Sequence, residues 1–460
     1  MRKPAGALVA LCVLIVGCAT KLQEAPSEEQ VLEDALPDST EIKLEWAAPA
    51  DDNGQVNDDW LATFNDAQLD ALVAEALNEQ NPNLRLLAAQ LDRAQAVAAL
   101  AGSSLKPTIA VGGDLSGTGG SNSAGEGSAG AGVGVSWEAD VWGRVQAGVN
   151  AADENLRASV ADFEFARQSL VANVAMSWYL ATELRLQAEL VQEIVDSLSE
   201  SVSLVETKEK VGQVSLQDVY LVRADLATAE DALQQAISGQ QQIRRALEIL
   251  LGRYPAGEIA TASELVPVPP PIGVGLPVDL LERRPDVIAA DRRVASAFFL
   301  TEEARLAKLP SFSINATAGG ASDVSGLIGD LSLGLVAPLF TGGALEAQLD
   351  IATADQEAAI AAYGATVLQA LEEVEAGLTN ESLLERREMY LSRSVNNNRQ
   401  AYDLALKQYD VGQIDLLSVL QMQTRWIGAR TGLLRVKNAR LAERINLHLA
   451  LGGSFEATAE

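Results

Sequence analysis

Proline placement limits what this chain can fold into more than any other feature of its sequence. The 460 residues include 15 prolines, yet none of them lies within residues 108–254 or 339–460. Because a proline costs about 3 kcal/mol inside a helix, two long stretches without it are typical of very long helices. The chain is 48% apolar, which is enough for a sizeable core and too much for a disordered chain.

Charge and rare residue types exclude several classes of function. Acidic residues outnumber basic ones 63 to 34, a formal net charge of −29, and this disfavours a nucleic-acid partner. A single histidine, His448, and only two cysteines exclude zinc fingers, iron–sulfur clusters and disulfide frameworks. We therefore expect no metal, no cofactor and no nucleic acid. The function has to be inferred from the arrangement of helices and strands.

The first residues have the order of a secretory signal peptide. A basic start precedes an apolar run over residues 5–16, too short for a membrane span of roughly 20 residues. The tetrad Ile15-Val16-Gly17-Cys18 resembles the bacterial lipobox, in which the cysteine is lipidated and becomes the first mature residue. The resemblance implies removal of residues 1–17 and a lipid anchor at Cys18 in the outer membrane. A plain signal peptide that happens to contain cysteine is the alternative.

The two halves of the chain follow one plan. Residues 211–220 and 411–420 are identical at five positions (Val, Gly, Gln, Leu and Val), and Pro82 and Pro107 match Pro285 and Pro310 at an offset of 203. Each half should contain a short helical segment (about 65–101 and 285–307), a strand pair around a glycine-rich loop, and a helical run of over a hundred residues. Ordered matches of this kind predict two internal structural repeats.

The predicted regions follow from this plan. They are a signal peptide (1–17), a lipidated N-terminal linker (18–60), a first repeat (61–254, strands about 107–141, long helices about 144–251), a proline-rich linker (255–280), a second repeat (281–452, strands about 310–340, long helices about 343–451) and a tail (453–460). Five prolines between 267 and 277 favour an extended, stiff connection between the repeats.

The four predicted strands alternate with a period of two residues. In the first, Ile109, Val111 and Leu115 share one face, opposite Thr108 and Asp114. Each alternating pattern spans about 8–10 residues, close to the roughly 9–11 of a membrane strand, although soluble hairpins packed on helices would alternate in the same way. In hydrocarbon, the two edges of a four-stranded sheet would be unsatisfied. A membrane location therefore requires an oligomer, and three copies would supply twelve strands.

The helical runs are long and carry coiled-coil spacing. Residues 144–211 would span roughly 100 Å as one helix, ending at a turn at Gly212, and the second half repeats this with a turn at Gly412. The return helix has a heptad seam at Val219, Val222, Leu226, Ala229, Leu233, Ala236, Gln240, Ile243, Leu247 and Leu250. Residues 186–205 carry two apolar stripes, which favours a wall of helices over an ordinary two-helix hairpin.

Three motifs resemble the TolC-like outer-membrane efflux proteins, specifically their lipidated branch. They are Ser-Trp-Glu-Ala-Asp-Val-Trp-Gly-Arg at 136–144, Leu-Leu-Glu-Arg-Arg-Pro-Asp-Val at 280–287 and Tyr-Asp-Val-Gly at 409–412, and the likeness covers about residues 55–452. The resemblance implies an α+β membrane protein, a homotrimer whose chains each give four strands to one 12-stranded β-barrel in outer-membrane lipid. A long α-helical coiled-coil tunnel would extend into the periplasm. A periplasmic adaptor (membrane fusion) protein and an inner-membrane RND-type pump would dock at its tip.

The resemblance also indicates a pore gate beside the two glycine turns. Leu417 matches the family's apolar constriction, whereas Gln421 and Thr424 occupy positions at which related channels often carry an aspartate and an arginine. Without that charge pair we predict a looser or mainly hydrophobic gate, since a neutral hydrogen bond contributes only about 0.5–1.5 kcal/mol. Asp218 and Asp415 could form acidic rings in a trimer, or could be acids that favour helix N-termini.

Other motifs do not support an enzyme. Residues 125–130 fit Gly-x-Gly-x-x-Gly, but we expect them in a loop between strands with no helix to receive a phosphate. His448 stands on an apolar helix and is predicted to be a packed or rim histidine. The sequence therefore predicts a passive exit channel of a tripartite efflux system. The alternatives are an exit duct for type I protein secretion, a non-porous periplasmic coiled-coil scaffold lipoprotein and, more weakly, an exported lipoprotein hydrolase.

Overall fold

The computed structural model describes most of the chain as two compact units. The described residues are 22–37, 39–40, 42–49, 54–56, 58–120, 123–321 and 326–456. A strand unit holds the described parts of 1–41, 89–162 and 286–366, and a helical unit holds those of 42–88, 163–285 and 367–460. The predicted signal peptide (1–17) and the predicted lipid anchor, Cys18, lie outside the described residues.

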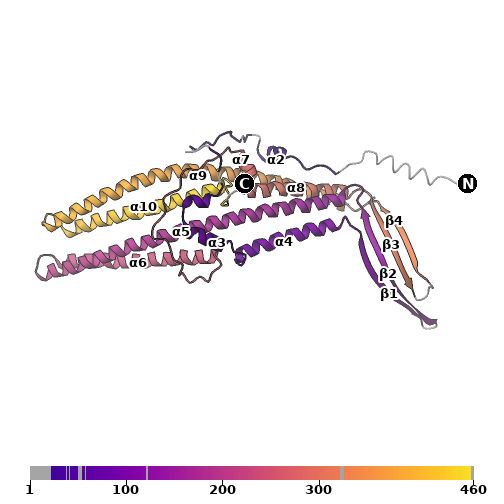
Figure 1. The fold of residues 1–460 in the computed structure, drawn as a ribbon, viewed down its shortest axis with the longest axis horizontal. Helices are drawn as coiled ribbons and strands as arrows, with labels where there is room; N and C mark the ends of the chain where they lie inside the picture. The colour runs from indigo at the N-terminus through magenta and orange to yellow at the C-terminus, as the bar shows by residue number, and fades with distance from the viewer. Residues whose placement is uncertain are drawn as a thin grey trace. The chain divides into compact units, whose positions relative to one another are not determined.

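Four antiparallel strands form the sheet of the strand unit. They are β1 (Thr108–Gly120), β2 (Ser123–Ala139), β3 (Ser311–Ala321) and β4 (Ile328–Val336), and they lie side by side in the order β1-β2-β3-β4 (Figure 1). The two hairpins come from the two halves of the chain, and the pairing of β2 with β3 joins them. The sequence prediction of four strands per chain is confirmed. Among the described residues, no further strand pairs with β1 or β4.

The register gathers the apolar residues of all four strands on one face. Ile109 pairs with Val135, Val135 with Ala316, and Ala316 with Leu331. Because directly paired residues point to the same side, this rung is continuous across the sheet. The neighbouring rung is small or polar: Ala110, Gly134, Thr317 and Asp330. Large apolar side chains on this face are not covered by other parts of the described chain: Val111 is 81% exposed and Leu333 is 79% exposed.

Strand β2 is longer than its apolar pattern indicated. Its 17 residues include Gly125–Gly130, the segment expected to be a loop, so that expectation was wrong. Gly127 pairs with Gly117 and Ala129 with Leu115. Glycine, serine and alanine can adopt the extended conformation once backbone pairing with β1 holds them, but they give no alternation of apolar side chains from which a strand could be predicted.

The first short helical segment is two helices. In place of one run over about 65–101, the chain forms α3 (Ala67–Ala76) and α4 (Pro82–Ser103). Asn81 occupies the break: its Nδ2 donates to Ala76 O and Leu250 O, both at 2.8 Å, and its Oδ1 accepts from Asn83 N. Pro82 is the first helical residue, where its missing N–H costs nothing. The matching α8 (Pro285–Leu306) also begins at a proline, and the five-residue α7 (Asp279–Arg283) precedes it.

The long helices have the lengths that the proline-free stretches predicted. They are α5 (Arg144–Lys210) and α9 (Ala344–Asp410), with 67 residues each, and α6 (Leu216–Leu250) and α10 (Leu416–Ala450), with 35 each. The first and last residues of α5 and α6 differ from those of α9 and α10 by 200. Seam residues Val219, Val222 and Leu247 are buried, as the heptad pattern predicted. No helix within the described residues has both the length and the apolarity needed to cross a membrane.

Several aromatic side chains form the centre of the helical unit. The short helix η1 (Trp60–Phe64) packs into a buried cluster with Trp178 and Tyr179 of α5, Leu247 of α6 and Leu441 of α10. Trp178 Nε1 donates to Asp66 Oδ2 at 2.9 Å, and Asp66 Oδ1 also caps α3. This cluster therefore packs the middle of α5 against the C-terminal ends of α6 and α10.

The region predicted as an N-terminal linker is partly structured. In the strand unit, α2 (Glu28–Ala35) starts with a capping box at Ser27, and Val31 is buried. A Cβ on Gly364 of α9 would be only 2.4 Å from Ala35 O, so this helix end lies directly against the α9 backbone. In the helical unit, Ala47 N and Ala48 N each donate to the Glu375 carboxylate at 2.7 Å.

Candidate functional site at the two helical turns

The two glycine turns have the same backbone geometry. Gly212 and Gly412 have φ angles of +72° and +75°, and each follows the last residues of a long helix. Gly212 N donates to Glu209 O at 2.8 Å and Gln213 N to Lys208 O at 2.9 Å; the second turn repeats both bonds one repeat later. This pair of bonds is the Schellman motif, whose left-handed position favours glycine. The turns therefore end α5 and α9 at fixed points.

The return helices α6 and α10 begin with the same two residue types in exchanged positions. Ser215 caps α6 and pairs with Asp218 three residues later, whereas Asp415 caps α10 and pairs with Ser418. Bonds from the Ser418 hydroxyl and backbone N–H to the Asp415 carboxylate lower the pKa of Asp415 below its ordinary value. Both predicted acids thus stabilise helix N-termini. Both also remain exposed.

The predicted gate residues share one exposed face of α10. Leu417 is 48% exposed, and Gln421 and Thr424 are also exposed, at the four- and three-residue spacing that places residues on one helix face. The Thr424 hydroxyl donates to Leu420 O at 2.9 Å, so it is occupied within its own helix. The adjacent residue Arg425 is exposed as well. Positions 421 and 424 are neutral, but a positive charge does lie beside them.

A contact between the two turns was not predicted from the sequence. Lys208 Nζ, in the last turn of α5, lies 4.2 Å from the centroid of the Tyr409 ring in the last turn of α9 and donates to its hydroxyl. A cavity of about 690 Å³ beside this contact is lined by Asp218 and Asp415. Lys208 and Tyr409 are 201 residues apart, and no local pattern signals that they meet.

The side of α10 away from the gate face contacts α5 and α9. Gln423 Nε2 donates to Ser197 Oγ at 2.7 Å, and Arg430 Nη1 lies 2.5 Å from Glu193 Oε2. Trp426 stacks on Tyr402 of α9, with centroids 5.5 Å apart. These contacts hold one side of α10, whereas Leu417, Gln421 and Thr424 lie on its exposed side.

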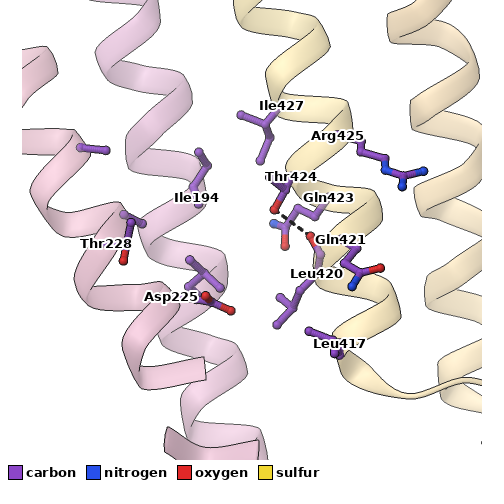
Figure 2. Close-up of a pocket in the computed structure, with 13 residues that line it drawn as sticks. Ile194, Asp225, Thr228, Leu417, Leu420, Gln421, Gln423, Thr424, Arg425 and Ile427 are labelled. Atoms are coloured by element: carbon purple, nitrogen blue, oxygen red, sulfur yellow. Dashed lines mark hydrogen bonds between the residues drawn. The ribbon is translucent and has the colours of Figure 1, made fainter. Parts of the chain in front are cut away.

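A groove separates this part of α10 from α5 and α6. Its volume is about 570 Å³, and Leu417, Gln421 and Thr424 line it together with residues of both other helices (Figure 2). Asp225 of α6 is the acidic residue among them. Nothing in the sequence singled out Asp225, because its position opposite α10 depends on how two distant helices pack. In the described part of the chain, no cluster of three or more His, Cys, Asp or Glu residues could hold a metal ion.

Substituting one turn glycine should separate its backbone role from any steric role. Gly412→Ala is expected to destabilise the turn by about 1–2 kcal/mol, because a left-handed conformation is unfavourable for alanine. A Cβ there would have no atom within 4 Å. Amide hydrogen exchange over residues 405–416 should therefore become about 5–30-fold faster. The control is Gly239→Ala inside α6, which also meets no atom within 4 Å but should slow exchange, since alanine favours helix. Equal effects of the two substitutions would contradict this account.

A four-stranded sheet with one open apolar face and two long helical hairpins that turn at matched glycines are features of TolC-like outer-membrane channels. Residues 73–253 and 276–453 match the family described as "Outer membrane efflux protein", and the chain belongs to that family. It is thus an efflux channel of the outer membrane that extends into the periplasm.

Named relatives agree with this placement. The chain is 29% identical to the pyoverdine export outer membrane protein OpmQ of Pseudomonas putida, over 90% of this chain and 92% of the relative. It is 30% identical to the toluene efflux pump outer membrane protein TtgF of the same species, over 86% and 85%. The solved structure of the CmeC outer membrane channel of Campylobacter jejuni has a TM-score of 0.86, covering 95% of this chain and 96% of that one. At 20% identity it shows the fold alone.

Proposed function

We propose that three copies of this chain form the exit duct of a tripartite efflux pump. The observation that carries the proposal is the sheet: one continuous apolar face and two edges, on β1 and β4, without a partner strand among the described residues. Such edges are not tolerated in hydrocarbon. Pairing β1 of one copy with β4 of the next would satisfy both edges, and three copies would close a 12-stranded barrel. Matched α5–α6 and α9–α10 pairs, two repeats of one plan, would form the periplasmic tunnel.

The N-terminal segment supports a lipid anchor at Cys18. A Cβ on Gly143 would be 3.1 Å from Leu22 Cβ, so Leu22 lies beside the junction of β2 and α5. This junction is where a barrel strand would leave the membrane. An acyl chain on Cys18, carried by the same N-terminal segment, would enter the same membrane as the sheet.

The exposed face of α10 is the proposed gate. Leu417 would form an apolar constriction, with Gln421 and Thr424 behind it and the acids Asp218 and Asp415 near the turns as acidic rings. The Lys208–Tyr409 contact would hold the two turns of one chain together in the closed state.

A periplasmic adaptor and an inner-membrane RND-type pump would dock at these turns, and cargo would move passively. Relatives named for pyoverdine and toluene favour a small-molecule cargo over type I protein secretion.

Single-channel conductance in a planar bilayer tests this function. The protein should show a small or flickering conductance, and Leu417→Ala should increase the mean conductance several-fold because it shortens the apolar side chain at the constriction. Leu404→Ala is the control, since Leu404 is similarly exposed, at 56%, but lies on α9. Inserted, folded protein that conducts in neither form would instead favour a non-porous scaffold. Equal increases in the two variants would reject Leu417 as the gate.

A further inference from the structure

The groove beside the gate face has two chemically different parts. Apolar side chains form its floor: Ile194 and Leu198 of α5, Ala229 of α6, and Leu420 and Ile427 of α10. Leu198, Ala229, Leu420 and Ile427 are each less than 9% exposed. The opening is polar, with the exposed Thr228 of α6 and Thr424 of α10, whereas the lining residue Gln423 is buried at 8% exposed. An apolar floor with a few polar groups at the opening is typical of small-molecule sites, and about 570 Å³ lies within their usual range of ~300–1,000 Å³.

One negative charge is directed into this groove. Figure 2 shows the Asp225 side chain pointing from α6 toward α10, whereas Arg425, the other charged lining residue, points away from α6. In the part of the chain that the structure describes, Asp225 makes no hydrogen bond and no ion pair. The polar neighbours Thr424 and Gln423 are already bonded, to Leu420 O at 2.9 Å and to Ser197 Oγ at 2.7 Å. Asp225 is thus the group left to recognise an occupant.

We propose that this groove is a binding site for lipophilic cations, with Asp225 contacting the positive charge. Apolar groups of the ligand would lie against Leu420 and Ile427, and the side of the ligand at the polar opening would face Asp225. A neutral ligand would lose the interaction with Asp225, and an anion would be repelled by it. The site deepens the proposed function and rests on it, since it names a class of molecule that the channel would hold during passage.

Occupation of the groove should change conduction. Leu420 contributes to the floor, and Leu417, Gln421 and Thr424 on the same two turns of α10 form the proposed gate face. A ligand between α6 and α10 is therefore in contact with the helix that carries the gate. At low ligand concentration the channel should show discrete interruptions of current, each lasting as long as the ligand stays bound.

The test uses two probes of matched shape and opposite charge. Tetraphenylphosphonium, added to the bath in a planar-bilayer recording, should interrupt the current in a saturable manner, and tetraphenylborate should not. Asp225→Asn should raise the concentration for half-maximal block about tenfold, as expected for loss of roughly 1.4 kcal/mol. Asp225→Glu, which keeps the charge, should restore most of the block. Glu230→Gln is the control, because Glu230 is an exposed acid of α6 that does not line the groove.

Two results would overturn the proposal while leaving the channel function intact. One is normal conductance with no block by tetraphenylphosphonium in the unaltered protein. The other is an equal loss of block in Asp225→Asn and Glu230→Gln, which would indicate a general charge effect. Absence of any conductance in folded, inserted protein would be a failure of the proposed function itself. If Asp225→Asn does not fold, Ile427→Ser tests the floor of the same groove, with the same tenfold weakening expected.

Discussion

Replacing Glu381 with glutamine is expected to lower the free energy of unfolding by about 3–5 kcal/mol, because it leaves a buried charge without its partner. Glu381 Oε1 lies 2.5 Å from Arg444 Nη2, and these side chains are only 11% and 3% exposed. Arg444 Nη1 also donates to Pro269 O at 3.0 Å and to Pro270 O. The ion pair therefore fastens the proline-rich linker to α9 and α10. Thermal unfolding followed by circular dichroism should show the loss of stability, and hydrogen exchange should report the release of residues 263–276.

Two controls separate the buried charge from charge changes in general. Asp403→Asn removes the partner of Arg399 in a pair 3.9 Å apart, with side chains 55% and 67% exposed. That change should cost no more than about 0.5 kcal/mol, since exposed pairs contribute little. The double variant Glu381→Leu with Arg444→Met should recover most of the lost stability, because no unpaired charge remains. Equal costs for Glu381→Gln and Asp403→Asn would refute the argument.

The long helices and the sheet could be predicted because their signals are local and repeated. Absence of proline, heptad spacing and a glycine at each turn set the ends of α5 and α9 to within a residue of the structure. Apolar alternation placed Ile109, Val111 and Leu115 on one face, and the register extends that face across all four strands. Alternation failed at the paired ends of β1 and β2, over 116–120 and 123–130, where glycine and serine replace the apolar residues.

The groove and the contacts between helices could not be predicted, because they depend on residues far apart in the chain. Asp225 and Thr424 come from different repeats, and Lys208 meets Tyr409 only once both turns have formed. Arg425 was not predicted for a different reason: the family resemblance marks positions 421 and 424, and Arg425 lies beside them on the same exposed side. The sequence allowed two roles for Asp218 and Asp415: acidic rings in a trimer, or acids that stabilise helix N-termini. The structure shows the capping bonds, and the ring stays a prediction.

His448 is expected to make the protein progressively less stable as the pH falls below about 6.5. Its ring is 4% exposed and stacks on Trp60, with centroids 5.6 Å apart, which fits the predicted packed histidine. Burial, and then the charge of Arg444, lower its pKa to about 3 from the ordinary 6.5. The unfolded chain therefore binds a proton at a pH at which the folded chain does not, and stability decreases between pH 6.5 and 3. The loss should reach about 2 kcal/mol at pH 5.

The variant His448→Phe isolates this effect, since it retains an aromatic ring beside Trp60 and cannot titrate. Other buried groups act with the opposite sign: burial raises the pKa of the Glu183 and Glu443 carboxyls, so the folded chain accepts their protons more readily as the pH falls. The unaltered protein and His448→Phe both contain these two carboxyls. Subtracting the free energy of unfolding of one protein from that of the other at each pH therefore removes their contribution. That difference should grow by about 1.4 kcal/mol per pH unit between pH 6 and 4. A constant difference over this range would show that His448 does not stay neutral in the folded chain.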